Sequence, residues 1–335
     1  MPLNNQEKNI VRQYNFIYEK LYKFDKKLLS LRKKMIKKNL KECRISKNHN
    51  LDSIMDVGTG IQTIALSKLF PHSKIYHYDM NLKIVNIMKK NSNKNIFSKR
   101  INLSSQKVEN KFNFIYLYGI VHHLRNYNFF FNNLNNILKK KGKVFFRIYR
   151  TGSLGFYIVD FIRKFIAKDK NKFKRFILSR IVKPYPDKLY ERMIDDFIID
   201  YVHLFEIKNL LKYLKNNNFN LVYVSKHKNY DHSSKSYLQG ISIAIEKISE
   251  KRKKNKMIIK TQDQLEDIDY KEPYIKKTNK MLKILLKKSN TLSNKFSFII
   301  ELYRKTQTKD NKNNYSQKKN HLMIQDIILK YFKND

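Results

Sequence analysis

A glycine-containing turn and a nearby aspartate have the residue types and spacing that suit ligand binding. In SIMDVGTGIQTIAL an apolar run reaches Asp56, breaks at Gly58 and Gly60, and continues with helical spacing. Glycine lets the backbone adopt positive φ and approach a ligand closely, and a helix N-terminus attracts negative charge. Asp79 ends the next strand-like segment, where a carboxylate can accept hydrogen bonds from two vicinal ribose hydroxyls. Together they predict a site for a ribose-containing ligand beyond the carboxyl ends of parallel strands.

The turn departs from the dinucleotide-binding pattern G-x-G-x-x-G. The last glycine of that pattern corresponds to Thr63, which disfavours the dinucleotide interpretation. Gln62 stands where a G-x-G-x-G turn has its last glycine, so its side chain must turn away from a ligand or hydrogen-bond to it. A turn that has lost its binding function is therefore an alternative interpretation.

Strand and helix patterns alternate along much of the chain, which predicts an α/β fold with a parallel sheet and right-handed crossovers. The predicted strands are 53–57, 73–79, 95–99, 112–120, 141–150, 219–227 and 236–247, and the last two are expected to pair as an antiparallel edge. Helical periodicity is found at 5–42, from 61 onward, and at 81–90, 126–140 and 204–218.

Four segments of the chain resemble class I S-adenosylmethionine-dependent methyltransferases. They are IMDVGTG, YHYDMN, FNFIYLYGIVHHL and ILKKKGKVFFRIYR, in the order and at the spacing of that family. The resemblance covers 51–150 and extends to 204–246. It implies a Rossmann-like, seven-stranded, mostly parallel sheet with helices on both faces, and S-adenosylmethionine as the methyl donor.

The resemblance also implies which residues contact the cofactor. The matching positions are Asp56, Gly58, Gly60, Asp79, Met80, Asn102, Leu103, Tyr118 and Gly119. The first three lie beside the methionine moiety and the ribose, and the last two line the methionine end of the pocket. Asp79 matches the acidic residue that binds the ribose hydroxyls, and Met80 packs near the adenine. Asn102 and Leu103 fall where the family often has an aspartate and an apolar residue that contact adenine.

Two adjacent histidines, His122 and His123, follow the fourth predicted strand. Since the pKa of histidine lies near neutrality, either one is a candidate general base for the methyl acceptor. The alternative is that one packs against the cofactor and the other is structural. Because the sulfonium donor is already activated, we expect methyl transfer to depend mainly on positioning.

A second candidate group lies in DDFIIDYVHLF. Asp196, Asp200 and His203 stand four and seven residues apart, so a helix would place them on one face. They are candidates for acceptor contacts, for acid–base chemistry or for a metal. The alternative, which we favour, is a polar helix face whose aspartates pair with the abundant lysines. No metal is assigned from the sequence.

The basic amphipathic stretch 153–175 places apolar side chains opposite charged ones such as Arg163. Its predicted role is a lid helix over the pocket, and contact with a membrane surface is the alternative. The predicted organisation is a helical N-terminal cap at 1–50, a methyltransferase domain at 51–250 with a helical insertion at 151–203, and a basic helical C-terminal extension at 251–335.

The formal net charge of +43 over 335 residues has two interpretations, an anionic partner or, the one we favour, a coding bias with a solvated basic surface. The excess is mostly lysine spread along the whole chain, together with much asparagine and isoleucine, which is typical of an AT-rich coding bias. Methylation of RNA or DNA is therefore an alternative. It is disfavoured because no N/D-P-P-Y/F segment follows the fourth strand.

Cys43 is the only cysteine, so the chain cannot form an internal disulfide, which fits a reducing cytoplasm. No apolar run approaches the roughly 20 residues that span a bilayer, and no signal peptide is visible. The expected partner is a small-molecule or glycan-precursor-type acceptor in the cytoplasm. The sequence does not indicate the acceptor atom or the oligomeric state.

Overall fold

A computed structural model describes most residues within 26–46, 51–91, 93–150, 202–225 and 240–248, with single residues or short runs within 5–15, 163–176, 261–263 and 295–300. The chain divides into two compact units. The first contains Met1–Arg150, Asp200–Lys226 and Gly240–Gln262, and the second contains Thr151–Ile199, His227–Gln239 and Asp263–Asp335. The glycine turn and Asp79 belong to the first unit.

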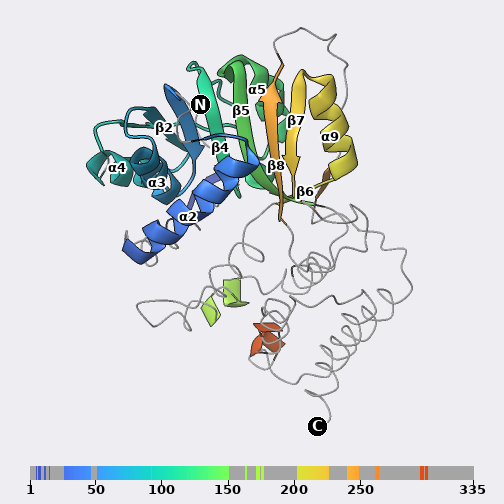
Figure 1. Ribbon diagram of the computed structural model, residues 1–335. Helices are drawn as coiled ribbons and strands as arrows, with labels where there is room; N and C mark the ends of the chain where they lie inside the picture. The colour runs from blue at the N-terminus through green and yellow to red at the C-terminus, as the bar shows by residue number, and fades with distance from the viewer. Residues whose placement is uncertain are drawn as a thin grey trace. The chain divides into compact units, whose positions relative to one another are not determined.

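Seven strands of the first unit form one sheet in the order β3-β2-β1-β4-β5-β8-β7 (Figure 1). In chain order they are β1 (Ser53–Val57), β2 (Lys74–Asp79), β3 (Ile96–Arg100), β4 (Phe112–Tyr118), β5 (Leu138–Tyr149), β7 (Phe219–Val224) and β8 (Gly240–Lys247). Neighbouring strands are parallel except at β8, which runs antiparallel to β5 and to β7. The predicted seven-stranded, mostly parallel sheet is confirmed, as is the antiparallel pairing of the last two strands.

Helices cover both faces of this sheet (Figure 1). They are α2 (Lys26–Glu42), α3 (Ile61–Leu69), α4 (Leu82–Asn91), α5 (Tyr127–Ile137) and α9 (Ile207–Asn216), with a short 3₁₀ turn, η1, at Val121–His123. Ile36, Ala65 and Met88 bring α2, α3 and α4 into one hydrophobic core. Phe131 and Leu210 bring α5 and α9 into the other core. The predicted helical layers are thus confirmed.

The central strand β4 has a continuous apolar sequence because it is buried on both faces. Successive side chains of a strand point to opposite faces, and both faces are covered here. Phe114 and Tyr116 enter the core under α2, α3 and α4, whereas Ile115 and Leu117 enter the core under α5 and α9. The buried phenol of Tyr116 accepts a hydrogen bond of 2.8 Å from the side-chain amide of Asn39.

The strand order reverses at β1, which pairs with β2 on one side and with β4 on the other. Such a switch point leaves a crevice beyond the carboxyl ends of the two diverging strands, where open α/β sheets bind their ligands. The loop after β1 carries Gly58 and Gly60, and the loop after β4 carries Gly119. The topology therefore brings the predicted binding residues to one edge of the sheet.

Two predicted helix boundaries are wrong. The helix predicted at 126–140 ends at Ile137, because β5 already begins at Leu138, and the helix predicted from 204 begins at Ile207. Residues 203–205 form a strand, β6 (His203–Phe205), which pairs with β9 (Thr261–Asp263) rather than starting the following helix. A parallel bridge also joins Phe205 to Arg150, and the Phe205 ring packs against Phe131 at 6.2 Å. These tertiary contacts fix an extended backbone despite the local helical spacing.

The N-terminal helical region is described in part. Residues 26–42 form α2, as predicted, and the described residues between 5 and 15 are also helical. The apolar residues of this region that recur at helical spacing lie outside the described residues; they are Ile10, Tyr14, Ile17, Leu21 and Phe24.

Described residues of the second unit include a small aromatic contact. Phe173 and Phe296 are buried, and their ring centroids lie 4.9 Å apart. Arg163, which the sequence predicts opposite the apolar side chains of a helix, is helical and buried. The rest of the stretch 153–175 lies largely outside the described residues, and the domain boundaries stay a prediction.

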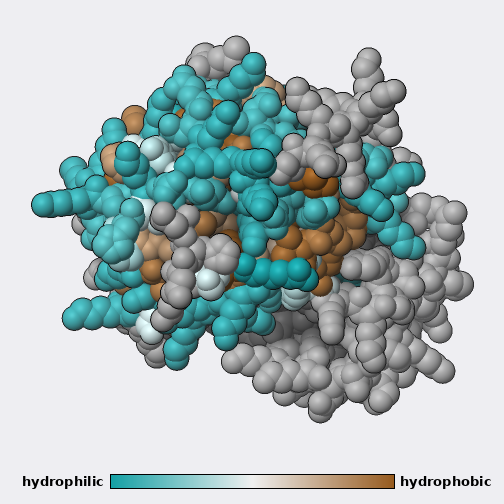
Figure 2. All heavy atoms as spheres, turned by 45° about the horizontal axis from the view of Figure 1, so that its top comes forward, coloured by the Kyte–Doolittle hydropathy of each residue, from teal (hydrophilic) through white to brown (hydrophobic). Residues whose placement is uncertain are grey.

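The surface of the described part is mostly hydrophilic on the face that Figure 2 shows, with apolar residues between the polar ones. The large hydrophobic side chains with about half of their surface exposed, Leu31, Leu82, Phe97 and Leu221, come from four different elements. Within the described ranges, no helix is long and apolar enough to cross a membrane.

Candidate active site

A buried histidine of β2, His77, stabilises the glycine turn after β1 by a hydrogen bond. The backbone N–H of Gly58 donates to the carbonyl of Tyr78 at 3.2 Å, and His77 Nε2 lies 2.7 Å from the Gly58 carbonyl. Burial lowers the pKa of His77 to about 4, so the ring is neutral near pH 7. A neutral ring has one N–H. Nε2 therefore donates to Gly58, and Nδ1 accepts from the Ser98 hydroxyl at 2.8 Å.

Glycine is required in this turn by backbone conformation and by packing. Gly58 has φ of 110° and Gly60 has φ of 82°, values that L-residues with side chains rarely adopt. A Cβ at Gly58 would lie 2.9 Å from Ile120 Cδ1, and a Cβ at Gly60 would collide with the side chain of Met88. The turn is therefore shaped by contacts within the protein as well as by any ligand.

Asp56 is committed to the turn itself. Its Oδ2 accepts from the Thr63 hydroxyl at 2.6 Å, and the backbone N–H groups of Val57 and Thr63 also donate to the carboxyl. Burial raises its pKa to about 7 despite these hydrogen bonds, and the nearby Asp79 raises it further. The carboxyl thus fixes the first turn of α3 to the end of β1.

Gln62 turns toward its own loop. Its Oε1 accepts a hydrogen bond of 3.0 Å from the Thr59 hydroxyl, and the residue is 8% exposed. The turn therefore tolerates glutamine in place of glycine, because the Gln62 side chain packs along the turn and is held there by Thr59.

Asp79 lies at the end of β2 with hydrogen-bonding capacity to spare. Its Oδ1 accepts from the backbone N–H of Asn81 at 2.7 Å, and no other described residue donates to the carboxyl. A carboxylate has about four lone-pair positions, so Oδ2 remains for ligand hydroxyls. The residue as a whole is half-buried, but burial around the carboxyl raises its pKa to about 7.

The positions predicted near adenine lie at the ends of β2 and β3. Met80 is half-buried, and its carbonyl accepts from Arg100 Nε at 3.1 Å. Leu103 is buried in the core under α5. Asn102 is buried, its Oδ1 accepts from the Ser104 N–H at 3.0 Å, and its Nδ2 donates to Glu7 at 2.8 Å.

The end of β4 provides open space. Gly119 has φ of 78°, and a Cβ built there would meet no atom of the described residues within 4 Å. Its N–H donates to the carbonyl of Arg147 at 3.2 Å. The Arg147 guanidinium carbon lies 5.5 Å from the ring centroid of Tyr118, within the range of a cation–π contact. The side chains of Tyr118 and Arg147 therefore lie next to the open space at Gly119.

His122 is buried in a stack of rings next to this space. Its ring lies 3.8 Å from the Tyr149 ring and 4.2 Å from the His123 ring, between centroids. Its Nδ1 is buried and has no hydrogen-bond partner among the described residues. Burial lowers the pKa of His122 well below its usual value, and His123, His203 and Arg147 lower it further. The ring is therefore neutral near pH 7.

His203 reaches the same end of the sheet, although not in the way predicted. It stands in β6, and its ring lies 4.7 Å from the Tyr127 ring. Since His203 is in a strand, the expected helical face shared with Asp196 and Asp200 is wrong for this residue. The two aspartates lie outside the described residues. Within the described ranges, no group of three or more metal-ligating side chains is close enough to hold a metal ion.

Sequence reasoning gave no role to several residues of this edge. Thr63 donates to Asp56, Arg147 lies against the Tyr118 ring, Tyr149 stacks on His122, and Glu7 contacts Asn102. The alternation of β5 was a usable signal, because Arg147 and Tyr149 interrupt its apolar run on one face. Glu7 had no comparable local signal.

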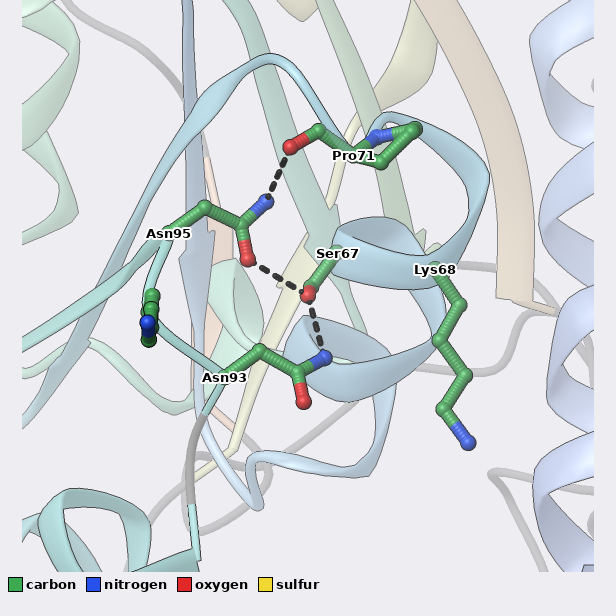
Figure 3. Close-up of a pocket in the computed structure, with 6 residues that line it drawn as sticks. Ser67, Lys68, Pro71, Asn93 and Asn95 are labelled. Atoms are coloured by element: carbon green, nitrogen blue, oxygen red, sulfur yellow. Dashed lines mark hydrogen bonds between the residues drawn. The ribbon is translucent and has the colours of Figure 1, made fainter.

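A separate pocket of about 350 Å³ lies at the opposite edge of the sheet. It is formed by the end of α3 and the loops before β2 and β3, and Figure 3 shows its side chains bonded to one another. Ser67 Oγ donates to Asn95 Oδ1 at 2.8 Å and accepts from Asn93 Nδ2 at 2.7 Å. Asn95 Nδ2 also donates to nearby loop carbonyls. This network ties two loops to a helix, far from the carboxyl ends.

Comparison with known families gives one broad match. A family model described as "Methyltransferase domain" matches residues 24–224, which is more than half of the chain. The search of curated proteins found no match to this chain.

Solved structures that resemble the chain are methyltransferases of low sequence identity. Coclaurine N-methyltransferase bound to N-methylheliamine and SAH is 14% identical, with a TM-score of 0.31 over 34% of this chain and 34% of that one. PKMT2 from Rickettsia typhi in complex with AdoHcy is 14% identical, with a TM-score of 0.40 over 51% and 39%. A SAM-dependent methyltransferase from Methanosarcina mazei is 14% identical, with a TM-score of 0.37 over 59% and 93%. The chain thus spans well under half the length of the first two.

Proposed function

Because this chain belongs to the family of methyltransferase domains, we propose that it transfers the methyl group of S-adenosylmethionine to a small-molecule or glycan-precursor-type acceptor. S-adenosylmethionine is the cofactor that this membership implies. The observation that carries the proposal is the meeting of the glycine turn, Asp79 and the open position at Gly119 at one sheet edge.

The residues present suit that cofactor. Asp79 keeps Oδ2 for ribose hydroxyls, and Gly119 leaves space that a side chain would fill. Met80 is half-buried and offers apolar surface near the position assigned to adenine, whereas Leu103 is part of the core below it. The bound sulfonium supplies an activated methyl group, so the protein has to align the acceptor and exclude water. Asp56, Gly58 and Gly60 would act mainly by shaping the turn, because the contacts that they make lie within the protein.

The histidines support a mechanism based on positioning. A general base works best when its pKa is near the working pH, and burial moves the pKa of His122 well below that range. Its stacking on Tyr149 and His123 suits a rigid wall for the acceptor. We therefore assign His122 and His123 to the shape of the acceptor pocket, with proton removal as the minor alternative.

The acceptor class is tested by labelled methyl transfer. The purified protein is incubated with methyl-labelled S-adenosylmethionine and an extract separated into low-molecular-mass, RNA, DNA and protein fractions. Label in the low-molecular-mass fraction supports the proposal. Label confined to RNA, with binding that weakens steeply with salt, would contradict it and favour the alternative suggested by the +43 charge.

The interpretation as a decayed scaffold is tested on the same preparation. Mass spectrometry of the purified protein detects bound S-adenosylmethionine or its demethylated product. The anchored side chain of Gln62 supports a functional turn. We keep the cytoplasm as the proposed location, because the single thiol, Cys43, excludes an internal disulfide.

A further inference from the structure

An arginine interrupts the apolar sequence of the inner strand β5. Arg147 stands between Phe146 and Ile148, which are buried, and it is itself half-buried. β5 pairs with β4 on one side and with β8 on the other, so the residue lies within the sheet and not on an edge strand. Because a partly buried charge costs free energy unless it is paired, the surroundings of this guanidinium indicate its role.

The guanidinium of Arg147 has no anionic partner among the described residues. Its side chain contacts the ring of Tyr118, the adjacent residue on β4, whose centroid lies 5.5 Å from the guanidinium carbon. The ion pairs of Lys139 with Asp52 and of Lys143 with Glu246 lie elsewhere. A guanidinium has five N–H donors in a planar fork, and in the described part of the chain none of them is used in a hydrogen bond.

The neighbouring backbone leaves room for this side chain. Gly240 lies on the adjacent strand β8, and a Cβ built there would be 2.5 Å from Arg147 Nε. A side chain at position 240 would therefore displace the guanidinium. On the β4 side, the backbone N–H of Gly119 donates to the Arg147 carbonyl, next to the open space at Gly119. Glycines on both sides thus keep the arginine accessible.

The place of Arg147 in the sheet favours a contact with the acceptor over one with the cofactor. β4 separates β5 from β1, so the arginine stands on the far side of β4 from the glycine turn. Its charge is close enough to His122 to contribute to the lowered pKa of that histidine. It therefore belongs with the stacked rings of His122 and Tyr149, which we assign to the acceptor pocket.

We propose that Arg147 binds an anionic group of the methyl acceptor, a carboxylate or a phosphate. This inference rests on the proposed function, because it requires the acceptor to lie over the ends of β4 and β5. The planar fork of a guanidinium can donate two parallel hydrogen bonds to either group. The contact with Tyr118 positions the guanidinium without an opposing charge, which leaves its charge for the ligand.

The test compares the acceptor kinetics of wild type and two variants. The substrates are methyl-labelled S-adenosylmethionine and a dilution series of the low-molecular-mass fraction. Arg147→Gln should raise the apparent KM for the acceptor by about tenfold to a hundredfold, as for a hydrogen bond to a charged group, with kcat within about threefold. Arg147→Lys keeps the charge and loses the fork, so its KM should lie between the two. Arg125→Gln is the matched control and should leave KM unchanged, since Arg125 is exposed in the loop after η1.

Two further measurements identify the group that the arginine binds. Treatment of the fraction with phosphatase and phosphodiesterase before the assay should abolish labelling if the group is a phosphate, and should leave labelling intact if it is a carboxylate. Calorimetry with S-adenosylhomocysteine should give affinities within about twofold of each other for Arg147→Gln and wild type, because the arginine does not contact the cofactor.

Several results would overturn the inference. An unchanged KM in Arg147→Gln, or a labelled product that an anion-exchange column does not retain, would do so and leave the proposed function intact. Weaker binding of S-adenosylhomocysteine by Arg147→Gln would also do so, since the guanidinium would then hold the carboxylate of the cofactor. Absence of methyl transfer by the wild type to every fraction would overturn the proposed function as well. Thermal unfolding establishes that each variant is folded, and Arg147→Lys serves if the glutamine variant is not.

Discussion

The two halves of the carboxyl edge of the sheet differ in their chemistry. The ends of β1, β2 and β3 carry carboxyl and amide groups, and Asp56, Asp79 and Asn102 are each held by short hydrogen bonds. The ends of β4 and β5, with the nearby β6, carry imidazole, phenol and guanidinium groups that meet through ring contacts, as His122 does with Tyr149. The first half is organised by hydrogen bonds, and the second by stacking and positive charge.

Under the proposed function, the hydrogen-bonded half would hold the cofactor and the ring-lined half would hold the acceptor. The cofactor is the same molecule for the whole family, so a local hydrogen-bonded frame can be shared widely. The acceptor differs between members, and stacked rings with basic groups suit one particular acceptor. Under the proposed function, the features particular to this chain are therefore expected beyond the ends of β4 and β5.

The largest expected effect is a pH dependence of the free energy of unfolding that comes from the buried carboxyl groups of the first half. The pKa values of Asp56 and Asp79 are raised to about 7 by burial, above the usual value of 3.8. The folded protein therefore holds protons that the unfolded chain releases between about pH 4 and pH 7. The contribution of these two carboxyls to stability without cofactor is full below about pH 4 and is lost, by roughly several kcal/mol, as pH rises to about 7.

Urea unfolding at pH 5 and pH 8 measures this dependence. Asp79→Asn, which keeps the acceptor for the Asn81 N–H, should lose a large part of it. Asp52→Asn is the control, because Asp52 is exposed and pairs with Lys139 at the surface. An identical pH dependence in Asp79→Asn and wild type would contradict the burial of this carboxyl.

The next effect sharpens the distinction between a turn held by protein packing and an open binding position. Gly60→Ala places a methyl group against Met88 at positive φ, so we expect a loss of about 3 kcal/mol in the free energy of unfolding. Gly119→Ala has a similar φ but meets no neighbour, so it should cost only about 1 kcal/mol. Its methyl group should instead weaken cofactor binding. Equal destabilisation by both substitutions would remove the distinction.

A smaller effect concerns the ring-lined half. His122→Phe keeps the stack on Tyr149 and removes the ring nitrogens, and we expect the rate of methyl transfer to fall by less than about tenfold. The rate is measured with the acceptor fraction identified by labelled transfer. A loss of about a thousandfold, together with a changed pH profile, would instead show that His122 removes a proton.

The smallest effect lies at the opposite edge of the sheet. Ser67→Ala removes the hydroxyl shared by Asn93 and Asn95, and it should cost about 1 kcal/mol of stability. Affinity for S-adenosylhomocysteine should stay within about twofold of wild type, since the pocket is remote from the strand ends that carry the site. A large change in affinity would mean that the two edges are coupled.

Features that depend on neighbouring residues could be predicted from the sequence, and features that depend on contacts between distant residues could not. The strands, the glycine turn and Asp79 are encoded by local patterns, and the fold predicted from them is confirmed. The contact of Asn102 with Glu7 joins residues 95 positions apart, and no local pattern predicts it. The spacing of His203 predicts a helix, whereas pairing of β6 with β9 makes it a strand residue. The roles of the binding residues stay predictions.

The central claim is that Asp79 and the glycine turn hold S-adenosylmethionine, and calorimetric titration with S-adenosylhomocysteine tests it most directly. The account predicts that wild type binds and that Asp79→Ala binds at least about a hundredfold more weakly, because two hydrogen bonds to a carboxylate are lost. Absence of binding by the wild type, or equal affinity of Asp79→Ala and wild type, would contradict it.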